Sequence, residues 1–437
     1  MASELGRVQS RISRGRHSCS DSVSVVGAGF SGILAAYRLA LSGYPVCLID
    51  MDEQPGGVMK DDVIGGIPHL SGCHVIQSEM PEEYGFKLPA REDLVLSPNR
   101  VSSVTWSNNE TCFENGIEGP ISSTHPKSFM EKLDGPTEIH GESLADRIER
   151  YPEEIRLEIE EWTGLLSLAP GLVHQDSLEA LQLRRVFFPS RHAQDVRELK
   201  GKNSLADDLF GVAPTRARKI LLPMNGYSAW FASAINELRD LGVHYLPNRA
   251  AKPIVQDGRI HLRLGEDYFC PSVGIWCANP TPLAKALMPE SRWDGQSHLL
   301  TAWHVEIDDE TDTDFNYVQF FGHPSGVIRA TQYQFGGVRR ALVESLATTR
   351  QSASAARPAV LEAARKSGVI PRAILAAFTR RSYLTVSMHD RYQFRTMGQR
   401  LHEFGWAHSG LHLYSRSKRL AWLNDELRGE GASPLDR

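Results

Sequence analysis

The sequence lacks the cysteine spacings that bind zinc or form a redox-active disulfide. It contains no C-x-x-C pair and no Cys/His spacing of the zinc type. We therefore expect reduced thiols, no metal site and a cytoplasmic location. The six cysteines are Cys19, Cys47, Cys73, Cys112, Cys270 and Cys277.

The sequence also lacks an uninterrupted apolar run of 18 residues and an excess of positive charge. The missing apolar run argues against a transmembrane helix, so we expect no membrane partner. Its 48 basic and 53 acidic side chains give a net charge of -5, which argues against nucleic acid as a partner. Residues 1–20 carry arginines among serines without an apolar segment and predict a disordered tail.

The chain is longer than one hydrophobic core usually serves. Its 437 residues, 41% hydrophobic and 23% charged, have the composition of a globular protein. Two or three domains are expected, or one nucleotide-binding fold with large insertions.

The clearest local pattern spans Ser22 to Asp50 and predicts a strand, a glycine turn, a helix and a second strand. Gly27-x-Gly29-x-x-Gly32 lies between the first strand and the helix, and Asp50 closes the second strand. Glycines at these positions permit a tight turn, close approach of a pyrophosphate and close helix packing. The acid can accept hydrogen bonds from ribose hydroxyls, so the unit predicts a dinucleotide site.

The kind of dinucleotide follows from the acid and from a second pair of glycines. An acidic ribose partner disfavours a 2'-phosphate, which leaves FAD and NAD. Gly56 and Gly57 can bring the backbone close to a large cofactor, so we favour FAD over NAD. The predicted cofactor-binding residues are Gly27, Gly29, Phe30, Ser31, Gly32, Asp50, Met51, Gly56, Gly57, Val58 and Gly410.

The expected fold class is α/β, with a discontinuous N-terminal Rossmann-type FAD-binding fold, a helical insertion and an antiparallel β substrate domain. Within the substrate domain, residues 298–335 alternate like antiparallel strands and residues 338–382 are expected to be mainly helical. The predicted ranges are 21–124, 205–297 and 385–437 for FAD binding, 125–204 for the insertion and 298–384 for the substrate domain.

The N-terminal unit with its second glycine pair resembles the flavoproteins with two dinucleotide-binding domains. Within them, the chain most resembles the UDP-galactopyranose mutase group. Residues 72–78 are similar to its G-P-H-x-F-H-T segment, residues 223–227 to its P-x-G-G-Y turn, and residues 327–333 to its T-R-x-x-E strand.

Three positions depart from the patterns of that group. Gln77 replaces the second histidine, Gln332 replaces the glutamate, and Gly410-Leu411-His412 stands where the group has G-R-L. The missing arginine at position 411 leaves the flavin pyrophosphate contact without its expected partner, and the substrate or the reaction can differ.

The resemblance implies an FAD-dependent enzyme that isomerises a nucleotide-linked sugar, with the N5 atom of reduced flavin as the nucleophile. It implies catalytic roles for His74, Arg329 and Tyr333, and substrate contacts for Tyr227, Tyr317, Arg329 and Tyr333. A guanidinium can bind a diphosphate bidentately, which suits Arg329.

Other interpretations remain open at this point. Arg329 can instead form an ion pair on a strand surface, the tyrosines can be ordinary half-buried aromatics, and His74 can be a packed loop histidine. The chain can be an FAD-dependent oxidoreductase of a biosynthetic pathway, similar to the amine oxidases, or a scaffold without catalysis. A homodimer is an open alternative to a monomer.

Overall fold

The computed structural model describes most of the chain outside residues 1–21 and the long segment between residues 113 and 217. The described residues are 22–77, 80–99, 101–105, 110–112, 153, 218–292, 296–308, 317–321, 326–346, 353–385, 388–410 and 416–428. The expected tail lies outside the described residues, as does the expected helical insertion apart from Glu153.

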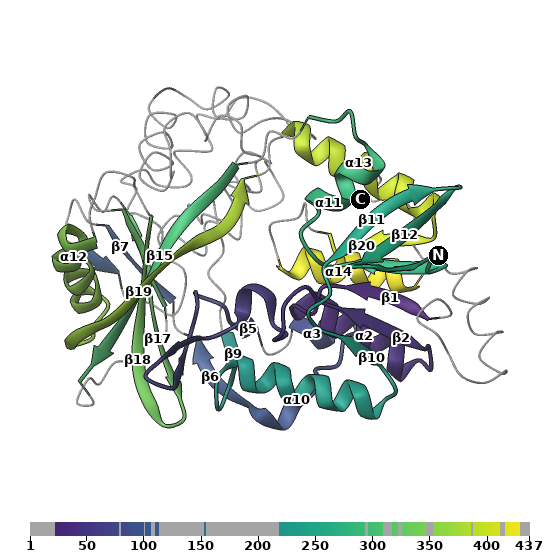
Figure 1. The fold of residues 1–437 in the computed structure, drawn as a ribbon. Helices are drawn as coiled ribbons and strands as arrows, with labels where there is room; N and C mark the ends of the chain where they lie inside the picture. The colour runs from purple at the N-terminus through teal and green to yellow at the C-terminus, as the bar shows by residue number, and fades with distance from the viewer. Residues whose placement is uncertain are drawn as a thin grey trace, which may run out of the picture.

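A five-stranded parallel sheet forms the nucleotide-binding part of the fold (Figure 1). Its order is β10-β2-β1-β14-β20, and every neighbouring pair is parallel. The strands are β1 (Val23–Val26), β2 (Val46–Ile49), β10 (His244–Leu246), β14 (Val273–Trp276) and β20 (Trp406–His408). Strands far apart in sequence therefore share one sheet, which confirms the expected discontinuous Rossmann-type fold.

Both faces of this sheet are covered, because alternate residues of its strands enter different apolar clusters. Val23 and Val25 pack in one cluster with helices α2 (Phe30–Leu41) and α10 (Tyr227–Asp240). Cys47 and Ile49 pack in another with helices α11 (Thr281–Leu287) and α13 (Met388–Glu403). Strands that are buried on both faces have continuous apolar sequences, so these strands can be predicted from the sequence.

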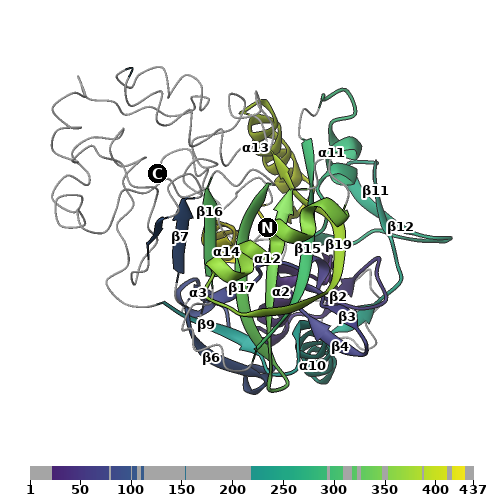
Figure 2. The ribbon, with the colours of Figure 1, turned by 90° about the vertical axis from the view of Figure 1, so that its left-hand side faces the viewer.

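A seven-stranded sheet forms the second part and lies beside the first in Figure 1. Its order is β19-β15-β18-β17-β16-β7-β8, with β16 and β7 parallel and the other neighbours antiparallel. Helix α12 (Ala353–Lys366) packs on it, as Figure 2 shows. The strands are β7 (Val101–Thr105), β8 (Glu110–Cys112), β15 (Gln296–Ile307), β16 (Tyr317–Phe321), β17 (Val327–Phe335), β18 (Val338–Leu346) and β19 (Pro371–Thr385).

The expectation that residues 338–382 are mainly helical is wrong. Among the described residues of this range only α12 is helical, whereas β18 and β19 flank it as long strands. Residues 341–345 of β18 are all buried, so the strand shows no alternation of apolar and polar residues. Its Ala, Leu, Arg and Glu favour a helix locally, and pairing with β15 and β17 on its two sides overrides that preference.

Shorter elements connect the two large sheets. Strands β3 (Asp62–Ile64) and β4 (Ile67–His69) form a hairpin. Strands β5 (Ile76–Gln77), β9 (Arg218–Pro223) and β6 (Leu94–Asn99) form a three-stranded sheet. The remaining elements are the strands β11 (Ala251–Gln256), β12 (Arg259–Leu264) and β13 (Asp267–Phe269), the helices α3 (Met80–Glu83) and α14 (Arg416–Arg428), and the 3-10 turns η3 (Gly57–Met59) and η4 (Arg91–Asp93).

None of the helices in the described ranges is long and apolar enough to cross a membrane.

The contact between β14 and β20 leaves no room for a side chain at Gly274. A Cβ atom added there would lie 2.5 Å from the ring of the buried Trp406. Gly274→Ala should therefore lower the free energy of unfolding by about 1–3 kcal/mol, as overpacked cores do. Equilibrium urea denaturation measures this change. Adding Trp406→Leu should recover part of the Gly274→Ala loss when compared with Trp406→Leu alone, and an unchanged midpoint for Gly274→Ala would contradict the packing described here.

Candidate functional site

The turn between β1 and α2 depends on glycine at two of its positions. Gly27 has φ of +101°, and a Cβ atom there would lie 2.9 Å from the backbone nitrogen of Ala278. A Cβ atom on Gly32 would lie 1.8 Å from the carbonyl oxygen of Gly27. Contacts within the protein thus require glycine at both positions. The lack of side chains there lets the first turn of α2 pack against the end of β1.

Gly29 is different, because its Cβ position is open on the protein side. The nearest atom to a Cβ there is the Cα of Gly57, at 3.9 Å. Gly29 forms an isolated bridge with Gly56, and the Gly56 amide donates to the Ala28 carbonyl at 2.8 Å. The second glycine pair therefore lies directly beside the glycine turn.

Helix α2 begins at this turn without a side-chain cap. Its N-cap is Gly29, and its first turn, which includes Phe30 and Ser31, contains no acidic residue. The N–H groups at a helix N-terminus and the positive end of the helix dipole both favour a phosphate. This end of α2 can accept a pyrophosphate without displacing any side chain.

Asp50, at the end of β2, is tied to the same turn. Its Oδ2 accepts a hydrogen bond from the Ala28 amide, and its Oδ1 accepts one from the Asp52 amide at 2.8 Å. Burial raises the pKa of Asp50, while these two hydrogen bonds act in the opposite direction. The Asp50 carboxylate thus stabilises the turn, and its contact with a ribose stays a prediction.

The space outside the turn is bordered by apolar side chains that the protein does not cover. Met51 and Val58 are 71% and 69% exposed. Gly410, with φ of +65°, follows β20 at the same carboxyl edge of the parallel sheet. Ligands of open α/β sheets bind at this edge, where the strand order reverses, here between β1 and β14. The predicted cofactor-binding residues fit a dinucleotide in type and arrangement.

Two of the residues predicted for catalysis, Arg329 and His74, lie at a buried ion pair on the seven-stranded sheet, whereas Tyr333 lies four residues further along β17. The Arg329 guanidinium donates through Nε to Oε2 of Glu344 and through Nη2 to Oε1 at 2.9 Å. The Cys73 amide donates to the same carboxylate at 3.1 Å. Burial would raise the pKa of Glu344, but attraction to Arg329 and its hydrogen bonds holds that pKa below the usual value.

His74 lies at this ion pair, and Tyr227 holds its backbone. A Cβ atom on Gly72 would lie 2.9 Å from Nε2 of His74 and 3.4 Å from Oε1 of Glu344. The Tyr227 hydroxyl donates to the His74 carbonyl at 2.8 Å. Tyr227 has no exposed surface, so its burial argues against the direct substrate contact that the sequence implied. We assign it a positioning role instead.

Tyr317 and Tyr333 lie on neighbouring strands but differ in surroundings. Tyr317 begins β16, opposite Thr331, and is half-buried, with an electrostatic interaction with Arg329. Tyr333 is 5% exposed, and burial raises its pKa above the ordinary value. The catalytic and substrate roles of these residues remain predictions.

A second polar cluster connects the β3–β4 hairpin to the same sheet. The His304 Nε2 atom lies 2.9 Å from Oδ2 of Asp62, which also accepts a hydrogen bond from Arg380. The His69 Nδ1 atom lies 3.1 Å from the Tyr333 hydroxyl, and the His69 and His304 rings meet edge-on at 5.1 Å. Burial lowers the pKa of His69 to about 4, so its ring is neutral at physiological pH.

Sequence reasoning missed Glu344 and most of this second cluster. Glu344 lies in the segment expected to be helical, and its partner Arg329 is 15 residues away on the neighbouring strand. Asp62 and His304 are 242 residues apart. The histidines and aspartate of this cluster have no characteristic spacing in the sequence, so only the pairing of distant strands brings them together.

Comparison with known proteins supports the fold. Residues 25–84 match the NAD(P)-binding Rossmann-like domain family. A search of curated proteins finds no match. The chain is similar to a solved reduced UDP-galactopyranose mutase, with a TM-score of 0.63, 13% identity and coverage of 94% of both chains.

Two other solved structures are similar at the same level. One is a protein assigned as a protoporphyrinogen oxidase, from Exiguobacterium sp. 255-15, with a TM-score of 0.61, 12% identity and coverage of 93% of this chain and 98% of that chain. The other is putrescine oxidase with bound putrescine, with a TM-score of 0.54, 14% identity and coverage of 93% and 97%. At these identities the likeness shows a shared fold, a Rossmann-like domain with a separate antiparallel sheet domain.

Because the space around Gly29 and Gly32 differs, substitution of each glycine by alanine should have a different effect. Gly29→Ala fills only the space over the helix N-terminus, so we expect at least tenfold weaker FAD binding, about 1.4 kcal/mol, with stability changed by no more than about 1 kcal/mol. Gly32→Ala should destabilise the fold itself by about 3 kcal/mol. Flavin absorbance after purification and urea denaturation measure the two effects. Wild-type FAD affinity in Gly29→Ala would refute the assignment of this turn.

Asp61 predicts a specific pH dependence of stability. Its Oδ2 accepts the Ser228 amide at the start of α10 at 2.7 Å, its Oδ1 is buried without a partner, and burial raises its pKa from 3.8 to about 6. The folded chain therefore binds a proton at Asp61 more tightly than the unfolded chain does. This proton binding stabilises the fold fully below about pH 4, and the stabilisation is lost as the pH rises through 6.

Asp61→Asn removes this titration and keeps an oxygen for Ser228. The variant should be more stable than the wild type at pH 8 by about 1–2 kcal/mol and equal to it below pH 4. The control is Asp240→Asn, at the exposed last residue of α10, the helix whose start Asp61 contacts. Denaturation at a series of pH values tests this. A constant difference at every pH would mean that Asp61 does not titrate as described.

Proposed function

We propose that the chain is an FAD-dependent enzyme that isomerises a nucleotide-linked sugar, in the manner of a pyranose-furanose mutase. The supporting observation is that the three separated segments that resemble the UDP-galactopyranose mutase group meet around one ion pair. Cys73 and Arg329 bind the same carboxylate of Glu344, and Tyr227 holds the carbonyl of His74. The similarity in fold to a mutase of this kind is consistent with the proposal.

FAD is proposed because the glycine turn fits a pyrophosphate and the second glycine pair lies beside it. The exposed Met51 and Val58 offer apolar contacts to the rest of a large cofactor. When bound and reduced, FAD would supply the nucleophile for the sugar. The protein would then orient the substrate and stabilise the charge that develops on the leaving diphosphate.

Arg329 is the proposed cation for that diphosphate. Glu344 engages its Nε and Nη2 atoms, whereas Nη1 makes no hydrogen bond among the described residues, and the side chain is 25% exposed. Glu344 therefore fixes the plane of the guanidinium and leaves one nitrogen for a phosphate oxygen. Tyr227 fixes the loop of His74, which would lie beside the flavin as the resemblance implies.

A second candidate function is an FAD-dependent oxidoreductase similar to the amine oxidases. The observation that favours it is the same ion pair, because Glu344 neutralises Arg329 and would repel a diphosphate placed against it. A substrate without a diphosphate avoids this repulsion. The similarity in fold to putrescine oxidase is compatible with this candidate.

The two candidates differ in the mass of the product. Dithionite-reduced protein, incubated with a panel of UDP-, GDP- and dTDP-linked sugars, should yield an isomer of unchanged mass, detected by chromatography and mass spectrometry. Arg329→Lys keeps the charge but removes the fork, so UDP should bind more weakly by about 1–3 kcal/mol while FAD content stays the same.

Arg372→Lys is the matched control, since the exposed Arg372 lies on the same sheet and pairs with the half-buried Asp308. UDP titration against flavin fluorescence measures the binding. If the wild type binds no nucleoside diphosphate, and a substrate instead loses two hydrogens under air, the oxidoreductase replaces the mutase. If UDP binds equally well to Arg329→Lys, only the role of Arg329 is wrong.

A further inference from the structure

The loop before β5 brings a histidine to the ion pair of β17 and β18. The His74 amide donates to the Gly72 carbonyl at 2.7 Å, and the His74 carbonyl accepts a hydrogen bond from the Tyr227 hydroxyl at 2.8 Å. The preceding Cys73 amide donates to the Glu344 carboxylate at 3.1 Å. These hydrogen bonds fix the backbone of the loop between α10 and the sheet.

The His74 ring folds back toward the Glu344 carboxylate over Gly72, which has no side chain. From the Cβ position of Gly72, Nε2 of His74 lies at 2.9 Å and Oε1 of Glu344 at 3.4 Å. Burial would raise the pKa of Glu344, but attraction to Arg329 and to His74 holds that pKa below the usual value. A carboxylate, a guanidinium and an imidazole therefore converge on one part of the sheet face.

Solvent reaches the basic groups of this cluster more than its acid. The Arg329 side chain is 25% exposed, whereas that of Glu344 is 4% exposed. His74 is half-buried. An anion can therefore approach Arg329 and His74 while Glu344 stays in its ion pair.

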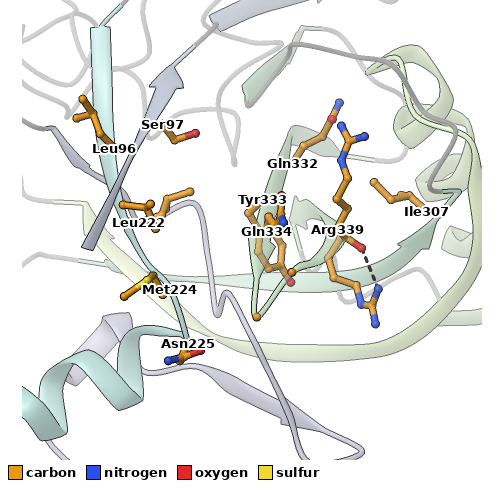
Figure 3. Close-up of a pocket in the computed structure, with 14 residues that line it drawn as sticks. Leu96, Ser97, Leu222, Met224, Asn225, Ile307, Gln332, Tyr333, Gln334 and Arg339 are labelled. Carbon is orange, nitrogen blue, oxygen red and sulfur yellow. Dashed lines mark hydrogen bonds between the residues drawn. The ribbon is translucent and has the colours of Figure 1, made fainter. Parts of the chain in front are cut away.

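The cavity at the other end of β17 is not part of this cluster. It has a volume of about 570 Å³ and is lined by residues of β6, β9, β17 and β18, with Tyr333 among them (Figure 3). Its 14 described lining residues do not include Arg329, Glu344 or His74. An anion at the ion pair therefore lies outside this cavity.

The charges of the cluster cancel when His74 is neutral. Arg329 contributes one positive charge and Glu344 one negative charge. Cys73 and Tyr317 also interact with the guanidinium, but thiol and phenol groups are ordinarily neutral at pH 7. A diphosphate with two negative charges would meet the repulsion of Glu344 with only one cation to offset it. Histidine is the side chain that takes up a proton most readily near neutral pH.

We propose that His74 takes up a proton when a diphosphate binds at Arg329, and that the imidazolium is the second cation of this site. The proton comes from solvent and stays on the imidazole, so no bond of the ligand forms or breaks. The inference rests on the proposed function, because it concerns the diphosphate site of that reaction. The diphosphate leaves the sugar carbon at which the flavin would react, so one side chain can lie beside both.

Other titratable groups nearby must be separated from His74. Burial raises the pKa of Asp61 to about 6, so this carboxyl titrates in the same pH range. The second polar cluster lies further along the same face and contains Asp62, His69, His304, Tyr333, Arg340 and Arg380. All of these groups remain in His74→Gln, so a pH dependence that this variant loses belongs to His74.

Calorimetric titration of the oxidised, full-length protein with UDP-glucose tests the inference. This diphosphate diester keeps two negative charges between pH 6 and pH 8, and the proposed reaction needs reduced flavin, so binding is measured without turnover. Uptake of a proton on binding makes the affinity fall as the pH rises. At constant ionic strength, the dissociation constant should rise at least tenfold from pH 6 to pH 8, and buffers of different ionisation enthalpy should report net proton uptake.

Two variants of His74 and one control assign the proton. His74→Gln should bind UDP-glucose as the wild type does at pH 8 and should show no pH dependence. His74→Lys carries a permanent charge and should bind at pH 8 as the wild type does at pH 6. The control is His402→Gln, which removes a histidine paired with the buried Glu426 outside the cluster and should keep the wild-type pH dependence.

Glu344→Gln tests the repulsion itself. This variant should bind UDP-glucose more tightly than the wild type at pH 8, because the negative charge beside Arg329 is gone. If the pH dependence persists in His74→Gln and disappears in Glu344→Gln, the proton is on Glu344 and the inference is wrong. Circular dichroism and flavin absorbance check that each variant is folded and contains FAD.

Sulfate is a second probe, with two negative charges over the same pH range and neither sugar nor base. If sulfate binds with a pH dependence that His74→Gln lacks but UDP-glucose does not bind, the role of His74 stands and the nucleotide-sugar function is wrong. If UDP-glucose binds equally at pH 6 and pH 8, the inference is overturned and the proposed function stands. If neither probe binds, both are wrong.

Discussion

The close backbone packing of Gly27, Gly32 and Ala278 is the constraint on which the nucleotide-binding site depends. With the Cβ position of Gly32 only 1.8 Å from the Gly27 carbonyl oxygen, helix α2 can start directly at the end of β1. The Cβ position of Gly27, at 2.9 Å from the Ala278 nitrogen, ties the same turn to the end of β14. Any side chain at either position would separate these elements, and the helix N-terminus would no longer point at the carboxyl edge of the sheet.

Buried charges set the position of the other half of the site. Residues 62–74 contact the seven-stranded sheet through Asp62 with His304 and Arg380, and through the Cys73 amide with Glu344. A buried charge is tolerated only where it is paired and hydrogen-bonded, and removing one partner leaves the other uncompensated. These pairs therefore fix the register between the hairpin and the sheet more strictly than apolar packing would, because an apolar contact survives a small shift and a bidentate ion pair does not.

The parts of the molecule that the sequence predicts well are those determined by local contacts. The strand, glycine turn and helix from Val23 to Leu41 follow from neighbours within a few residues, and the structure has them as expected. The position of Asp50 was also predictable, but its hydrogen bonds to the Ala28 and Asp52 amides were not, because a turn amide carries no sequence signal.

The parts that were missed depend on pairing between distant strands. Strand β18 has a helical composition and becomes a strand because β15 and β17 leave it no other partner. Glu344 lies on that strand, so its contact with Arg329 could not be foreseen. Gln332, which stands where the resembled group has a glutamate, donates its amide to the Ser367 carbonyl at 3.1 Å. It does not supply the missing carboxylate.

Two arginines of the seven-stranded sheet are consequently constrained toward an anion. Arg329 faces the buried Glu344 and Arg380 faces the half-buried Asp62, so an anion that approaches either one also meets the negative charge of that carboxylate. At an effective dielectric constant of 20, two like charges 4 Å apart repel by about 4 kcal/mol, which exceeds the roughly 1.5–3 kcal/mol that one charge-assisted hydrogen bond contributes. A diphosphate at Arg329 therefore needs a second cation or a proton on one partner. The sheet thus favours a diphosphate only where further cations reach Arg329.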